Sequence, residues 1–198
     1  CEFACAVEHS HTRDPVAALG EVPVPRKRVH VQAGPRANTA FPNKCRHCDP
    51  APCLQVCPTG AIYREVDHDA VLIDTGKCIA CAMCAMVCPF DVITYHALTN
   101  GVTPRTVAVK CDACIARQRD GRIPACVEVC PTKARIFGDQ EDPNAEIAKV
   151  LKAQKSFRLQ EDKGTQPNVH YVGKYSARGQ TTASHFGLWG RVHPAPFS

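Results

Sequence analysis

The spacing of the cysteines constrains this chain more than any other feature. Twelve of its 14 cysteines fall into three groups of four. The groups are C-x2-C-x4-C-x3-C (Cys45, Cys48, Cys53, Cys57), C-x2-C-x2-C-x3-C (Cys78, Cys81, Cys84, Cys88) and C-x2-C-x11-C-x3-C (Cys111, Cys114, Cys126, Cys130). The other two, Cys1 and Cys5, have the spacing of the closing half of a further group. Proline follows the last cysteine of each complete group (Pro58, Pro89 and Pro131).

The second group has the spacing that holds a 4Fe-4S cluster in bacterial ferredoxins. Three cysteines at short intervals wrap one cluster from a loop, and the fourth ligates a neighbouring cluster. Proline after the fourth cysteine fixes φ and donates no hydrogen bond, so it bends the chain away. Two such runs predict a two-cluster unit in which each run lends its last cysteine to the other.

Three other interpretations of the cysteines are open. Disulfides require an oxidising compartment and leave the repeated Cys-Pro endings unexplained. Structural zinc accounts for isolated C-x2-C pairs but does not need two more cysteines a few residues further on. Buried apolar thiols would not repeat at fixed intervals. The spacing therefore favours iron–sulfur clusters.

Composition and charge exclude several classes of protein. The 198 residues are only 6% aromatic, which is a poor inventory for a large apolar core. The net charge of +5 assumes neutral thiols, and each cluster with four thiolates brings about −2, so a nucleic-acid partner is not indicated. No apolar run approaches the roughly 20 residues of a membrane helix. Nucleotide-binding, zinc-protease and serine-hydrolase motifs are absent, which predicts a non-catalytic chain.

An internal repeat joins the three groups. Residues 57–63, 88–94 and 130–136 each read as a Cys-Pro turn followed by a β-prone run. Further strand-like runs cover 28–32, 70–74 and 106–110, and 115–120 resembles a short helix or turn. These elements predict an α+β fold of small hairpins and short helices around inorganic centres.

The chain changes character after Cys130. We expect an amphipathic helix over 143–155 that packs on the cluster-binding body, with Asp142 as its cap and one apolar face. That face is formed by Ile147, Val150 and Leu151.

The segment after Gly164 has little periodicity and predicts an extended tail. Its concentrated apolar group is Phe186, Leu188 and Trp189. We interpret the tail as an arm that lies along a partner subunit, and a disordered end is the alternative.

The cysteine groups resemble those of the four-cluster ferredoxin-like electron-transfer subunits of bacterial and archaeal oxidoreductases. Such subunits accompany dimethyl-sulfoxide-reductase relatives, formate dehydrogenases, tungsten aldehyde oxidoreductases, carbon monoxide dehydrogenases and some hydrogenases. The resemblance covers residues 1 to about 172 and includes RIPACVEVCP at 122–131. The start, CEFACAVEHS at 1–10, is most similar to subunits that serve carbon monoxide dehydrogenase and tungsten enzymes.

The resemblance implies a set of ligands for each cluster. The sets are Cys45, Cys48, Cys53 and Cys88; Cys57, Cys78, Cys81 and Cys84; and Cys5, Cys111, Cys114 and Cys126. A fourth cluster would use Cys1 and Cys130 with two cysteines expected before Cys1. We expect the chain to begin inside its first motif, and loss of the fourth site is the alternative. The sequence departs from the pattern at Ala6, where proline would follow Cys5.

The nested sets imply two tandem two-cluster units, one inserted in the other. Residues 41–98 would form the inserted unit, 1–40 plus 99–140 the outer unit, and 141–198 the C-terminal helix and partner-docking tail. The implied function is a non-catalytic subunit relaying single electrons between a catalytic subunit, of the molybdenum/tungsten-pterin or carbon monoxide dehydrogenase type, and another redox partner. A free-standing polyferredoxin carrier is the alternative. We expect no membrane span and a cytoplasmic location, with export to the periplasm left open.

Charged residues beside ligands are candidates for tuning cluster potentials. They are Arg46, His47, Lys77, Lys110 and Asp112. A solvated charge with no such role is the alternative for each.

Overall fold

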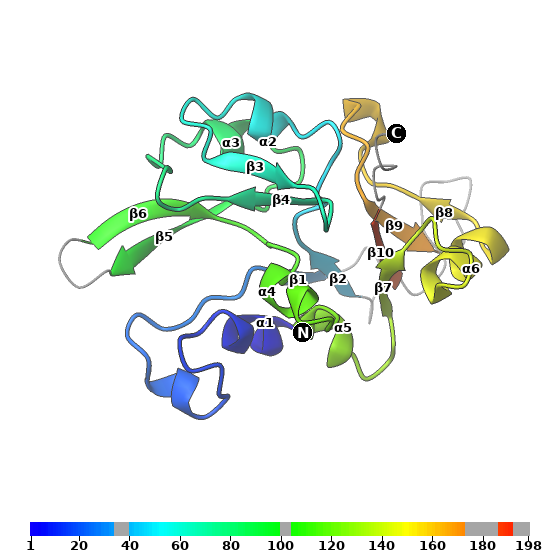
Figure 1. The fold of residues 1–198 in the computed structure, drawn as a ribbon, viewed down its shortest axis with the longest axis horizontal. Helices are drawn as coiled ribbons and strands as arrows, with labels where there is room; N and C mark the ends of the chain where they lie inside the picture. The colour runs from blue at the N-terminus through cyan, green and yellow to red at the C-terminus, as the bar shows by residue number, and fades with distance from the viewer. Residues whose placement is uncertain (34–39, 100–103, 173–185, 192–198) are drawn as a thin grey trace.

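The computed structural model describes residues 1–33, 40–99, 104–172 and 186–191. Their elements are short, and the fold is α+β as the sequence predicts. The strands form three antiparallel pairs and one four-stranded sheet, and short helices lie along their edges (Figure 1). No helix in these ranges is long and apolar enough to cross a membrane.

The three strand pairs lie next to the cysteine groups. They are β1 (His30–Ala33) with β2 (Ala40–Asn43), β3 (Ile62–Glu65) with β4 (Ala70–Ile73), and β5 (Thr94–Thr99) with β6 (Pro104–Val109). The runs expected at 28–32, 70–74 and 106–110 coincide with β1, β4 and β6, within the usual uncertainty at element ends. The runs after Cys57-Pro58 and Cys130-Pro131 end in strands, whereas the run after Cys88-Pro89 is mostly loop, because β5 begins only at Thr94. The expected boundary at 40/41 falls within β2, and the expected boundary at 98/99 falls at the end of β5. The β1–β2 and β5–β6 pairs therefore each join a strand of the expected outer unit to a strand of the expected inserted unit.

Five of the helices are one or two turns long. They are α1 (Glu2–Glu8), α2 (Pro52–Gln55), α3 (Met83–Val87), α4 (Ile115–Arg119) and α5 (Ala125–Glu128), with 3-10 turns at Ala17–Gly20 and Glu161–Lys163. Four of them carry a cysteine: Cys5, Cys53, Cys84 and Cys126. The chain thus places one thiol of each group on a short helix and the others on the adjoining loops.

A mixed sheet packs against the cluster-binding part of the chain. Its strands are β7 (Arg135–Asp139), β10 (Phe186–Arg191), β9 (Val169–Val172) and β8 (Ser156–Phe157), in that spatial order. β10 runs parallel to β7 and antiparallel to β9. The part of the predicted extended tail at 186–191 is therefore an inner strand of this sheet, because pairing on both sides satisfies its backbone groups. The rest of the tail lies outside the described residues.

The predicted amphipathic helix is present as α6 (Glu146–Ala153) and lies on this sheet (Figure 1). Ile147 is fully buried against Val172, while Val150 and Leu151 are half-buried beside them. Asp142 does not cap the helix, which corrects the expectation. Its Oδ1 accepts a hydrogen bond from the Asn144 amide at 2.9 Å, and the turn this forms delays the helix until after Ala145.

Candidate metal centres

Four cysteines from two groups line one hollow. Cys45, Cys48 and Cys53 come from the first group, and Cys88 is the last cysteine of the second. Its remaining walls are largely apolar, with Val71, Phe90, Val92 and Ile93 among them. The structure therefore brings together the first ligand set that the resemblance implies.

A second hollow shows the reciprocal arrangement. It is lined by Cys78, Cys81 and Cys84 of the second group together with Cys57, the last cysteine of the first. The amide of Ala108 on β6 donates to Cys78 Sγ at 3.3 Å, so the β5–β6 pair also covers this hollow. Each group therefore contributes three thiols to one hollow and its fourth thiol to the other.

The third group gathers around the N-terminal helix. Cys5, Cys111, Cys114 and Cys126 are all buried. Burial, together with the neighbouring Cys111 and Cys126 thiols, raises the pKa of Cys5 to about 12. The amide of Arg28 opposes this shift by donating to Cys5 Sγ at 3.2 Å. Burial and the Cys111 and Cys126 thiols likewise raise the pKa of Cys114, so the four thiols lie close enough to interact electrostatically.

Cys1 and Cys130 lie at the ends of two helices that pack together, α1 and α5. Cys1 is exposed, and Cys130 is half-buried with its Sγ 3.7 Å from Thr132 Oγ1. Burial would raise the pKa of Cys130, but hydrogen bonds with the Thr132 hydroxyl and with the amides of Ala134 and Thr132 lower it below its ordinary value. All 14 cysteines are free thiols, so the structure contains none of the disulfides considered above.

Each C-x2-C loop has the same unusual backbone. The residue before the second cysteine is in the left-handed region at His47, Ala80 and Ala113, with φ of 48°, 56° and 64°. This conformation costs a non-glycine residue about 1–2 kcal/mol. In the first loop it turns the His47 amide toward Cys45 Sγ, at 3.4 Å. Consecutive amides in such turns form a concave site for anions.

The Cys-Pro turns repeat just as closely, which confirms the internal repeat. The third residue after each closing cysteine, Gly60, Asp91 or Lys133, has φ of 62°, 50° or 49°. Its amide donates to the carbonyl of the closing cysteine at 3.3, 3.5 and 3.1 Å, respectively. The three turns therefore present their closing thiols in the same way.

These features fit iron–sulfur clusters. Burial raises the pKa of Cys48 and Cys111 to about 11 and that of Cys53 to about 12, so these thiols would stay protonated without a metal. A coordinated metal deprotonates such thiols. The amides directed at sulfur are the donors that tune cluster potentials.

Asp112 organises the third group through its carboxylate. Oδ1 lies 3.0 Å from His9 Nε2 and accepts from the Cys114 amide at 2.9 Å. Oδ2 accepts from Arg28 Nη1 at 2.7 Å. Burial would raise the pKa of Asp112, but the hydrogen bond from His9 and the charge of Arg28 hold it well below its usual value. His9 and Arg28 belong to no recognisable motif, so sequence reasoning missed this network.

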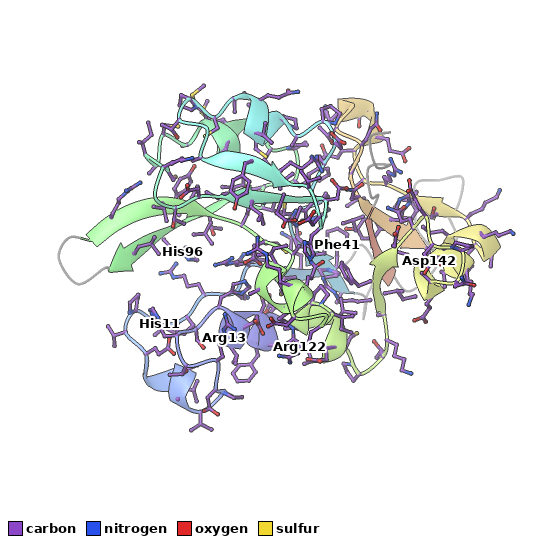
Figure 2. The ribbon with its side chains drawn as sticks, in the orientation of Figure 1. His11, Arg13, Phe41, His96, Arg122 and Asp142 are labelled. Carbon is purple, nitrogen blue, oxygen red and sulfur yellow. The ribbon has the colours of Figure 1, made fainter. Side chains whose placement is uncertain are left out.

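The candidate tuning residues occupy different environments. Arg46, His47 and Lys110 are buried, whereas the side chain of Lys77 is 64% exposed. The Arg46 guanidinium lies 4.9 Å from the Phe90 ring centre and 5.6 Å from that of Phe41, which Figure 2 places near the middle of the molecule. Sequence reasoning missed Lys44, which is as buried as Lys110. The sequence does contain a pattern that points to Lys44, because a lysine precedes the first cysteine of every complete group.

Each of the two hollows is lined by four free thiols, three from one cysteine group and one from the other. This arrangement defines a class of protein that binds several iron–sulfur clusters. The chain belongs to the family described as the 4Fe-4S dicluster domain, whose pattern matches residues 37–140.

Curated relatives agree with this assignment. A sulfite dehydrogenase subunit of Allochromatium vinosum is 37% identical over 70% of this chain, and the arsenate respiratory reductase iron-sulfur subunit ArrB of Shewanella sp. strain ANA-3 is 30% identical over 71%. An iron-sulfur protein of Rhodospirillum rubrum is 43% identical over 81% of this chain and 88% of its own length. The matched regions span 58% of the sulfite dehydrogenase protein and 77% of the arsenate reductase protein.

Proposed function

We propose that this chain is a non-catalytic electron-transfer subunit of an oxidoreductase complex, relaying single electrons between a catalytic subunit and another redox partner. The observation that carries the proposal is the exchange of Cys57 and Cys88 between two four-thiol hollows. An exchange of this kind is how two-cluster ferredoxins bind adjacent clusters, and adjacency is what a relay requires.

We further propose three complete ligand sets and part of a fourth. The complete sets are Cys45, Cys48, Cys53 and Cys88; Cys57, Cys78, Cys81 and Cys84; and Cys5, Cys111, Cys114 and Cys126. Cys1 and Cys130 are proposed as ligands of a fourth cluster, supported by the packing of α1 on α5. In this arrangement residues 41–98 form a two-cluster unit inserted into the one formed by 1–40 and 99–140.

The chain's own residues set the conditions for transfer. When bound, each cluster gains or loses one electron at a potential set by its surroundings. The apolar walls exclude water, the loop amides donate to sulfur, and Arg46 and Lys110 place positive charge in the interior. Cys81 is exposed, unlike Cys78 and Cys84, which supports an electron entry or exit point at the second hollow.

Exposed apolar side chains close to Cys81 in the sequence support a docking role for this segment. Ile79 is 61% exposed and Met86 is 83% exposed, with Met83 exposed between them. Large apolar groups left in water often mark protein interfaces. Two of the relatives are named as subunits, which supports a permanent catalytic partner. We propose a molybdenum/tungsten-pterin enzyme or a carbon monoxide dehydrogenase as that partner. Free thiols suit a reducing compartment, so we propose the cytoplasm.

Anaerobic purification from the native source tests this proposal. We expect the chain to co-elute with a larger redox protein on size exclusion, and reductant added to that protein to bleach the visible absorbance of the complex. Elution as a lone monomer that exchanges electrons freely with several enzymes would contradict the subunit role and favour a polyferredoxin carrier. A complex whose absorbance is unaffected by reduction would contradict both.

A further inference from the structure

Three lysine–cysteine pairs recur at intervals of 33 residues. Lys44, Lys77 and Lys110 each precede the first cysteine of a C-x2-C loop. The fold treats them differently. The side chain of Lys77 is 64% exposed and lies 3.8 Å from Asp74 Oδ2, whereas Lys44 and Lys110 are only 3% and 4% exposed. Burying an ammonium group is costly unless negative charge lies nearby, so the two buried positions require an explanation.

Lys110 precedes Cys111 of the third group in sequence, but its side chain lines the hollow formed mainly by the first group. It lines the hollow of Cys45, Cys48, Cys53 and Cys88. Its Nζ donates to the carbonyl of Val71, a wall of the same hollow, and to that of Cys111 at 3.2 Å. Its charge opposes the rise that burial causes in the pKa of Cys53. Lys110 therefore directs its charge at the hollow formed mainly by the first group.

Lys44 makes the reciprocal connection. Its Nζ donates to the carbonyl of Cys45 at 3.4 Å, the equivalent of the Lys110 bond to Cys111. The Lys44 side chain is buried, and its ammonium group contacts the first cysteine loop in the interior that this loop shares with the third group. Burial lowers the pKa of Lys44, and the charges of Cys111 and Cys126 oppose this lowering, in agreement with this placement. Cys45 and Cys111 belong to one core cluster, so the two lysines lie where the first and third groups meet.

We propose that Lys44 and Lys110 form a reciprocal pair of buried charges, each stabilising the reduced cluster held mainly by the other lysine's cysteine group. The inference rests on the clusters proposed above. Reduction adds one negative charge to a cluster, and a cation in a poorly solvated interior interacts with that charge strongly. Lys77 is solvated and screened, so the same dipeptide has a much weaker effect there.

The test compares Lys44→Met, Lys110→Met and Lys77→Met in the full chain by redox titration followed by electron paramagnetic resonance. Signals are assigned with Cys53→Ser and Cys114→Ser. Lys110→Met is expected to shift the reduction equilibrium of the Cys53 cluster about tenfold toward the oxidised form, which is about 59 mV for one electron. Lys44→Met is expected to shift the Cys114 cluster equally. Lys77→Met should shift its nearest cluster less than about twofold, and Lys44→Arg and Lys110→Arg should restore most of the potential.

Iron and sulfide content separates this inference from the proposed function. Wild-type protein without clusters would overturn both. If Lys44→Met and Lys110→Met bind their clusters fully but have the same potentials as Lys77→Met, the reciprocal pair is overturned and the proposed function stands. A shift confined to the cluster next to the substituted lysine in sequence would also overturn the reciprocal pair alone. Loss of iron in both methionine variants with full loading in the arginine variants would also overturn it, because the charge would then serve assembly rather than potential.

Discussion

Asp112 Oδ2 accepts a hydrogen bond from Arg28 Nη1 at 2.7 Å, which ties the segment before β1 to the loop between Cys111 and Cys114. The same carboxylate contacts His9 at 3.0 Å, so one side chain joins three segments of the third cysteine group. A partly buried pair that loses one partner leaves the other charge uncompensated.

Asp112→Asn is therefore expected to lower the free energy of unfolding by about 1–3 kcal/mol at neutral pH. The urea midpoint of the loaded protein measures the change. Asp74→Asn is the matched control, because its 3.8 Å pair with Lys77 is exposed and should contribute less than about 0.5 kcal/mol. Equal midpoints for the two variants would show that the Asp112 network does not stabilise the fold.

The exchange of closing cysteines predicts a selective loss of iron. Cys57→Ala should remove the cluster proposed to be held with Cys78, although Cys57 belongs to the first group, and should cost about four iron atoms per chain. Iron analysis together with paramagnetic resonance measures this loss. Thr59→Val, a substitution 3.7 Å from Cys57 Sγ, serves as the control and should retain full iron. Loss of the Cys53 cluster signal instead would mean that the sets do not exchange.

Arg46 joins the first cysteine loop to surrounding aromatic rings. It is 1% exposed, and its Nη1 donates to Asn43 Oδ1 at 2.8 Å beside the rings of Phe41 and Phe90. Arg46→Met should lower the free energy of unfolding by about 2–4 kcal/mol, because the cation–π contacts are lost and the Asn43 oxygen loses a donor. Thermal unfolding measures this change against Arg122→Met, whose side chain is 56% exposed and should matter little.

The buried side chain of His170 is expected to lower the free energy of unfolding in mild acid. Burial, with Arg158 adding to it, lowers the pKa of this histidine to about 4 from an ordinary value near 6.5. Between these values the unfolded chain binds the proton and the native chain does not. Stability is therefore complete above about pH 6.5 and declines as the pH falls toward 4, by about 1–2 kcal/mol after allowance for solvent screening. His170→Gln should flatten this part of the curve, and an unchanged slope would contradict the assignment.

Local patterns explain which parts of the structure could be predicted. The Cys-Pro turns, the short strands after them and the apolar face of α6 depend on neighbouring residues, so the sequence indicated each of them. Asp142 shows the limit of such patterns, because an Asx turn and a helix cap use the same side chain. The pairing of β10 with β7 and β9 depends on residues far apart in the chain.

The lysines show the same limit at the candidate site. Lys44, Lys77 and Lys110 occupy identical positions beside cysteines, yet two are buried and one is exposed. Tertiary packing alone decides this difference, just as it brings His9 and Arg28 to Asp112.

The most direct test of the account is the amount of iron and acid-labile sulfide per chain in protein prepared without oxygen. Three complete ligand sets predict at least about twelve of each, with broad visible absorption that reductant bleaches. Zinc without sulfide, or a colourless chain with neither metal nor sulfide, would contradict the claim that iron–sulfur clusters organise this protein.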